Sequence, residues 1–271
     1  MKAMRTYAVK MWRLLPLAAL AGSLECGALP SSARGEILAS GSDSTLHVMK
    51  ALAAAFEEET GTCMRLEGGG SGAGANAAIA GQVQLAFLSR ALLEKEIEGG
   101  LVGVPYAFDG VAVIVNKENP QTDITVTELR DLYTGRATLW KDGRPVVLFN
   151  RNTDSGTRQV FQDLVLGPGA AFTKKAAIKH DALLVRSVSK IPSSLAYTSL
   201  AEADETVVKV LSINGIKPGA ATIRDKSYSL SRTPTLATKG APSGDVKAFI
   251  DFVLGPRGQA IVEGQKLIRI R

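Results

Sequence analysis

The segment 151–158, which reads Arg-Asn-Thr-Asp-Ser-Gly-Thr-Arg, combines the guanidinium, hydroxyl and glycine residues that together can hold an anion. It follows the apolar run 146–149, which is typical of a short strand, and it precedes apolar residues at helical spacing over 160–165. We expect Asp154 or Ser155 to cap this helix, because short polar side chains accept hydrogen bonds from the first free backbone N–H groups.

The start of that helix is a candidate oxyanion site. The first N–H groups of a helix have no intrahelical partner and lie at the positive end of its dipole. Ser155, Gly156 and Thr157 are therefore expected to donate to a tetrahedral anion. Arg151 would add a two-pronged cationic clamp. The alternative is an ordinary capped helix with solvated charges.

A second segment of the same kind is 41–45, which reads Gly-Ser-Asp-Ser-Thr. It follows a short apolar strand and precedes a predicted helix over 48–56, which Gly61 would end. Ser44 and Thr45 would then lie at a helix N-terminus and become candidate ligand contacts.

A third segment, 68–74, contains five glycines and one serine between a predicted strand at 63–66 and a short predicted helix at 75–80. Glycine allows the backbone to approach a ligand closely. The alternative is a flexible linker, but a linker is not expected within an alternation of strands and helices. The candidate contacts in this segment are Gly70, Ser71 and Gly72.

Several other strings accompany these loops in a fixed order, namely 109–116, 129–138, 211–215, 228–232, 238–240 and 247–254, followed by Pro256 and Gly258-Gln259. With them, nearly the whole mature chain resembles the phosphate-binding protein family of bacterial ABC phosphate importers, in the type II periplasmic binding protein superfamily. The resemblance implies an α/β, two-lobe periplasmic binding protein fold with a hinge and an interlobe ligand cleft. The strand and helix alternation separately favours α/β lobes with mostly parallel sheets.

The resemblance also implies domain bounds. Residues 1–33 would be a signal peptide, 34–115 and 235–271 a discontinuous lobe I, and 116–234 lobe II. The anion would bridge the lobes, so that ligand contacts formed on closure convert binding into a change of shape.

By resemblance, the oxyanion contacts fall on Thr45, Ser71, Arg151 and the Ser155-Gly156-Thr157 triplet. The chain departs from some family members at Arg90, where they carry an aspartate that accepts the proton of hydrogen phosphate and repels fully ionised sulfate. Other members carry arginine there. We expect Arg90 to face the anion, or alternatively to pair with Glu94. Asp154 would orient the Arg151 guanidinium or serve as the missing acceptor.

The N-terminus has the pattern of a secretory signal. Basic residues precede a short apolar run over 14–21, and small residues follow at 31–33. Half of the net charge of +6 lies in this region, and no basic stripe is interleaved with aromatic residues, so nucleic acid is not an expected partner. Cleavage near Ala33 would leave Cys63 without an internal disulfide partner. Lipid attachment at Cys26 is the less favoured alternative for a periplasmic or otherwise secreted protein.

The prediction is a monomeric solute-binding protein, not an enzyme, that captures inorganic phosphate without a cofactor and delivers it to the membrane permease of an ABC importer. The alternatives are another tetrahedral oxyanion (molybdate, tungstate or sulfate) or a phosphate sensor without a transport role. A remote alternative is an NADP-binding oxidoreductase, because 70–75 loosely matches a dinucleotide fingerprint. His47 and His180 have no ligand cluster at metal spacing, and Ser155 lacks the Gly-x-Ser-x-Gly elbow of a hydrolase.

Overall fold

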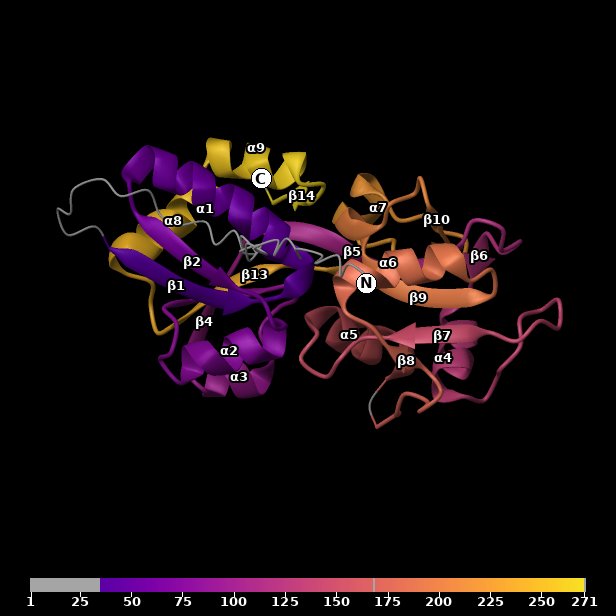
Figure 1. Ribbon diagram of the computed structural model, residues 1–271. Coiled ribbons are helices and arrows are strands. Elements are labelled where there is room, and N and C mark those ends of the chain that lie inside the picture. Colours follow the sequence, from indigo (N-terminus) through magenta and orange to yellow (C-terminus); the bar gives the residue numbers. More distant parts are fainter. Residues whose placement is uncertain (1–34, 168, 271) are drawn as a thin grey trace, which may run out of the picture. The chain divides into compact units, whose positions relative to one another are not determined.

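The fold is described from a computed structural model, which describes residues 35–167 and 169–270 (Figure 1). The predicted signal peptide and Cys26 lie outside these residues. The described residues form one compact unit, which contains two large sheets with helices in the connections between strands.

The first sheet has the strand order β2-β1-β3-β13-β4. Its strands are β1 (Glu36–Gly41), β2 (Cys63–Glu67), β3 (Leu85–Leu88), β4 (Leu101–Pro105) and β13 (Thr235–Lys239). β1 pairs in parallel with β2 and β3, whereas β13 is antiparallel to β3 and β4. Its helical segments are the 3-10 turn η1 (Asp43–Thr45), α1 (Leu46–Thr60), α2 (Ser71–Ile79), α3 (Glu94–Glu98), α8 (Gly244–Leu254) and α9 (Pro256–Gly264).

The second sheet has the strand order β10-β5-β9-β7-β8, and β12 and β14 also pair with β5. Its strands are β5 (Ala107–Asn116), β7 (Val147–Asn150), β8 (Ala177–Ile178), β9 (Ser194–Ser199), β10 (Val208–Val210), β12 (Ser231–Arg232) and β14 (Ile268–Arg269). The helical segments between them are α4 (Val126–Thr134), α5 (Gly156–Phe161), its π-helical continuation η2 (Gln162–Leu166), α6 (Asp181–Lys190), η3 (Leu200–Glu202) and α7 (Ala220–Arg224). A short parallel pair, β6 (Asp123–Ile124) and β11 (Ser212–Ile213), completes this part.

The α/β class is confirmed, but the sheets are mixed rather than mostly parallel. The parallel pairs of the two large sheets involve β1 or β7, the strands that lead into the candidate anion loops. The antiparallel pairs all involve β5 or β13. A strand that follows a helical crossover returns in the parallel direction, whereas β5 and β13 are reached by other connections.

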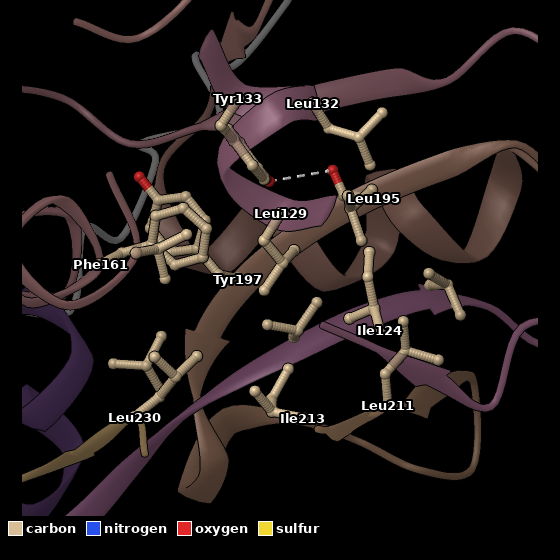
Figure 2. Close-up of a cluster of buried hydrophobic side chains, with 14 of the residues drawn as sticks. Ile124, Leu129, Leu132, Tyr133, Phe161, Leu195, Tyr197, Leu211, Ile213 and Leu230 are labelled. Carbon is tan, nitrogen blue, oxygen red and sulfur yellow. Dashed lines mark hydrogen bonds between the residues drawn. The ribbon is translucent and has the colours of Figure 1, made fainter. Parts of the chain in front are cut away.

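The aromatic side chains of Tyr133, Phe161 and Tyr197 lie together in one buried hydrophobic cluster (Figure 2). The rings of Phe161, the last residue of α5, and Tyr197 on β9 stack with centroids 4.0 Å apart. The Tyr197 hydroxyl in turn donates to Asn150 Oδ1, which also accepts from the backbone N–H of Arg151 at 2.8 Å. The Tyr133 hydroxyl on α4 donates to the Phe149 and Leu195 carbonyls. Buried packing therefore fixes both the loop that carries Arg151 and the helix that follows it.

Helix α2 begins earlier than the glycine-rich sequence predicts. Ser71 is already helical, although the prediction left 68–74 as a loop. The reason is packing, because a Cβ at Gly74 would lie 2.5 Å from the Ser40 carbonyl oxygen of β1. Glycine costs helix stability in general, yet here it allows the helix to lie against the strand.

The prediction that Cys63 has no disulfide partner concerns a chain cleaved near Ala33, and for that chain it stays a prediction. In the full chain, Cys63, at the start of β2, is disulfide-bonded. The full sequence contains two cysteines.

Candidate functional site

Three loops from different parts of the chain meet at one place. The Thr157 hydroxyl, in the first turn of α5, donates to Ser44 Oγ of η1 at 3.4 Å. Gly156 faces the start of α2, where a Cβ added to it would overlap Ser71 Oγ and lie 2.6 Å from Ser89 Oγ. The three segments singled out by sequence are therefore brought together.

The first loop directs buried hydroxyl groups toward this place. Ser44 and Thr45 are 1% and 0% exposed. Ser44 Oγ lies 3.0 Å from Ser42 Oγ, and the Thr45 hydroxyl donates weakly to the Ser42 carbonyl at 3.5 Å. The Asp43 carboxylate accepts from the Gly69 N–H at 2.8 Å, which ties the first loop to the second.

The second loop joins the other two through its backbone. The Gly70 N–H donates to the Gly41 carbonyl at 2.9 Å, and the Gly72 N–H donates to the Asp154 carbonyl at 3.0 Å. The backbone of Gly70 has a φ of 108°, a conformation that residues other than glycine rarely adopt. Ser71 is fully buried, and its Oγ accepts from the Ser89 N–H at 3.1 Å. Sequence reasoning missed Ser89 as a member of this cluster because the serine itself has no local signal.

The third loop begins α5 as predicted. Ser155 is the N-cap, with its Oγ accepting from the Arg158 N–H at 3.2 Å. Gly156 and Thr157 form the first turn and are buried. Asp154, the other predicted cap, has an exposed side chain.

Arg151 lies directly after β7 and is 2% exposed. It forms an ion pair with Asp181 at the start of α6, so the carboxylate that orients this guanidinium is Asp181 rather than the predicted Asp154. Within residues 35–167 and 169–270, Arg151 Nε has no hydrogen-bond partner. Burial lowers the pKa of the Arg151 guanidinium, and the nearby Glu202 carboxylate opposes that shift, but an arginine stays charged in any case.

Arg90 pairs with a different acid from the predicted one, and its contact with an anion stays a prediction. Its Nη1 and Nη2 each donate to one oxygen of Glu96 at 2.7 Å, and Nη1 also donates to the Ala91 carbonyl. The predicted partner, Glu94, is thus replaced by Glu96 two residues later. Both side chains of the pair are buried, and the carboxylate also accepts from the Leu93 N–H at the N-cap of α3.

A third buried ion pair, between Arg232 and Asp109, was missed by sequence reasoning. Arg232 on β12 donates through Nε and Nη2 to Asp109 Oδ2 on β5, at 2.9 and 2.6 Å. Its Nη1 donates to Thr157 Oγ1 at 2.7 Å. Both residues lie in strings that carried the family resemblance, but they are 123 positions apart and no local pattern links them.

A further acidic group, Glu202, lies near Arg151 and Arg232. Glu202 ends η3, and its Oε2 accepts from the Thr198 hydroxyl at 3.1 Å. Burial raises the pKa of Glu202 to about 7, although the Arg151 charge and the Thr198 hydrogen bond act in the opposite direction. Within the part of the chain that the structure describes, no cluster of His, Cys, Asp and Glu could hold a metal ion.

Buried hydroxyl groups, the start of a helix and a guanidinium with a free donor are the groups that bind a tetrahedral oxyanion. The chain matches the model of the PBP superfamily domain over residues 27–257. The chain therefore belongs to the PBP superfamily. The two-lobe fold class predicted from the sequence is thereby confirmed.

The named relatives and solved structures agree with this family. The phosphate-binding protein PstS of Borreliella burgdorferi is 29% identical over 217 residues, which is 74% of this chain and 78% of that protein. PstS of Bacillus subtilis is also 29% identical, over 82% of this chain and 76% of that protein. A crystal structure of a putative phosphate ABC transporter substrate-binding protein with bound phosphate, from Clostridium perfringens, superposes with a TM-score of 0.83 at 31% identity.

That superposition covers 88% of this chain and 100% of the Clostridium perfringens chain. An ABC-type phosphate transport receptor from Vibrio cholerae superposes with a TM-score of 0.75 at 26% identity, over 86% of this chain and 99% of the other. Among the helices of the described segments, none has the length and apolar character needed to cross a bilayer.

Proposed function

We propose that this chain is an extracytoplasmic solute-binding protein that captures inorganic phosphate where the three loops meet and delivers it to an ABC importer. The observation that carries the proposal is the meeting of buried Ser44, Ser71 and Thr157 beside the start of α5, near a buried arginine whose Nε has no partner in the described residues. Family membership and a relative whose structure contains bound phosphate support the choice of anion.

The proposed contacts divide by the kind of group that they offer. Hydroxyl donors come from Ser44, Thr45, Ser71, Ser155 and Thr157; close backbone approach and N–H donors come from Gly70, Gly72 and Gly156; and charge comes from Arg151. Because Ser155 Oγ already accepts from Arg158, its hydrogen is free to point toward an anion.

Arg90 and Asp154 have smaller parts in this proposal. The two terminal nitrogens of Arg90 are occupied by Glu96, so we assign Arg90 to holding the segment that carries Ser89 and leave only its Nε for the anion. Asp154 contributes its backbone carbonyl, which links the second and third loops through Gly72.

We further propose that residues 34–115 with 235–271 and residues 116–234 act as two lobes that close on the anion. Strand β5 pairs with β12 and β14 through its first half and with β9 and β10 through its second half. We therefore assign β5 as the strand along which the chain passes from one lobe to the other. A ligand held by loops from both sheets would favour the closed form by its differential affinity.

The related proteins are named as binding and transport proteins, which supports a non-catalytic role. A monomer with a membrane permease as partner remains part of the proposal. The alternatives are a different tetrahedral oxyanion or a phosphate sensor without transport. No observation among the described residues favours the NADP alternative, since the glycine run forms the start of α2 against β1 and the third loop.

Calorimetric titration of the dialysed protein with phosphate, arsenate, sulfate and molybdate tests the proposal. We expect one phosphate per chain, with sulfate and molybdate binding more weakly. The proposal would be refuted if the folded protein bound no phosphate at millimolar concentration. Tighter binding of molybdate or sulfate would identify that anion as the ligand instead.

A further inference from the structure

Asp109 and Arg232 have no part in the proposed anion contacts, but Arg232 is hydrogen-bonded to the third loop through Thr157. Asp109 and Arg232 are 1% and 5% exposed, and their ion pair joins β5 to β12. The only side chain of the anion loops that the Arg232 guanidinium contacts, among the described residues, is the Thr157 hydroxyl, at 2.7 Å from Nη1.

That contact restricts what the Thr157 hydroxyl can do. A threonine hydroxyl has one hydrogen to donate and two lone pairs that accept, and the hydrogen rotates to suit the partners. A guanidinium can only donate. Thr157 Oγ1 must therefore accept from Arg232 and direct its own hydrogen elsewhere, and it directs it toward Ser44 Oγ, at the place where the loops meet.

Arg232 is itself held in position by two hydrogen bonds to one oxygen of Asp109, and that oxygen accepts a third from Ser199. Its Nε and Nη2 both donate to Asp109 Oδ2, and the Ser199 hydroxyl donates to the same oxygen at 2.8 Å. Ser199 Oγ also accepts from the Ala201 N–H at the start of η3. The pair is electrically neutral as a unit, so it supplies geometry at the site rather than net attraction for an anion.

We propose that Asp109 and Arg232 are positioning residues that fix the Thr157 hydroxyl as an obligate hydrogen-bond donor to the bound oxyanion. The inference rests on the proposed function, since it needs an anion at the third loop. It adds a preference for the ligand, because an unprotonated, ionised oxygen is the stronger acceptor for the Thr157 hydrogen. Any proton on hydrogen phosphate is thereby directed to another part of the site.

A double-mutant cycle measured by calorimetric titration with inorganic phosphate tests this coupling. Thr157→Val removes the hydroxyl while keeping the shape, and we expect about a tenfold or greater loss of affinity, as for a hydrogen bond to a charged group. Thr157→Ser restores the hydroxyl and should bind within about threefold of the unchanged protein.

The other arm of the cycle removes the pair as a whole. Arg232→Met alone leaves Asp109 buried without a partner and endangers folding, so the variant is Asp109→Leu/Arg232→Met, which replaces both charges by apolar groups. We expect this protein to bind phosphate more weakly, because Thr157 regains its freedom to rotate. Adding Thr157→Val should then cost only about threefold or less, instead of tenfold.

The matched control is Glu36→Gln/Arg65→Met, which removes an exposed arginine pair between β1 and β2 and should leave phosphate affinity unchanged. Thermal unfolding confirms that each protein is folded. If the affinity losses of Thr157→Val and Asp109→Leu/Arg232→Met simply multiply in the combined variant, the proposed coupling between the ion pair and Thr157 is wrong. That outcome would not contradict phosphate binding itself. If the unchanged protein is folded but binds no phosphate, the proposed function itself is wrong, and so is the positioning role that depends on it.

Discussion

Arg151 differs from the other arginines around the loops in what its guanidinium still has available. Arg90 and Arg232 each give two nitrogens to one carboxylate and a further donor to the protein. Arg151 has an ion pair with Asp181. Arg90 Nε also has no partner in the described segments, but both Nε and Nη1 of Arg151 lack a hydrogen-bond partner there. Desolvation makes such a donor costly unless a ligand uses it. Arg151 is therefore the residue whose removal should most directly weaken anion binding.

We expect Arg151→Ala to weaken phosphate binding by about tenfold to over a hundredfold, since hydrogen bonds to charged groups contribute roughly 1.5–3 kcal/mol. The change also leaves Asp181 without its partner, so Arg151→Lys should recover stability better than affinity, because a lysine lacks the planar fork. Arg186→Ala, on the exposed face of α6, is the control. Affinity of Arg151→Ala equal to that of the control would remove Arg151 from the site.

Glu202 gives the fold a pH dependence. Its pKa is raised to about 7 in the folded protein from a usual value of 4.5, chiefly by burial. The folded state therefore holds the proton more tightly, and the contribution to stability is fully present below about pH 4.5 and is lost as pH rises toward 7. The loss is at most about 3 kcal/mol.

In phosphate-free buffer, Glu202→Gln should therefore be more stable than the unchanged protein at pH 8 and close to it at pH 4.5. The measurement is urea unfolding at both pH values. Thr198→Val tests the one direct hydrogen bond to this carboxylate without removing the charge. A stability difference that does not change with pH would contradict the assignment.

At the scale of elements, the features that depend on residues close together in the chain could be predicted from the sequence. The Ser155 cap, the end of α1 at Gly61 and the strand before the third loop follow from local pattern. Contacts that join distant segments do not. The partner of Arg151 comes from α6 and that of Arg232 from β5, and the length of α2 depends on the backbone of β1. The sequence alone does not indicate which acidic residue pairs with which arginine, because tertiary packing determines those pairs.

The contact between α2 and β1 is testable through Gly74. Alanine is a better helix former than glycine by about 1 kcal/mol, so local propensity alone predicts that Gly74→Ala stabilises the protein. A Cβ there would lie 2.5 Å from the Ser40 carbonyl oxygen and 2.6 Å from Gly41 Cα, and overpacking typically costs about 1–3 kcal/mol. We expect the steric effect to dominate, with net destabilisation and weaker phosphate binding through displacement of Ser71.

Gly264→Ala is the matched control, because Gly264 ends α9 and a Cβ there meets nothing within 4 Å. It should be neutral or slightly stabilising. Thermal unfolding of both variants separates propensity from packing, and a stabilised Gly74→Ala would mean that α2 moves away from β1 without cost.

At the scale of the whole molecule, the two sheets have separate hydrophobic clusters. One contains the β1, α1 and α8 side chains, with Phe56 and Phe249 in edge contact, and another contains Phe161, Tyr133 and Tyr197. The loops that meet at the candidate site come from both. An anion bound there adds interactions between the two sheets that the separate clusters do not provide, so ligand binding and folding should be linked.

The expected linkage is quantitative. At a phosphate concentration one hundred times the dissociation constant, the free energy of unfolding should rise by about 2.7 kcal/mol if phosphate binds only the folded state. Because the anion joins loops from both sheets, phosphate should also merge any separate unfolding steps of the two clusters into one transition. Scanning calorimetry of dialysed protein, with and without phosphate, measures both effects. Arg151→Ala should show little rise at the same phosphate concentration, and an equal rise in that variant would place the stabilising phosphate elsewhere on the protein.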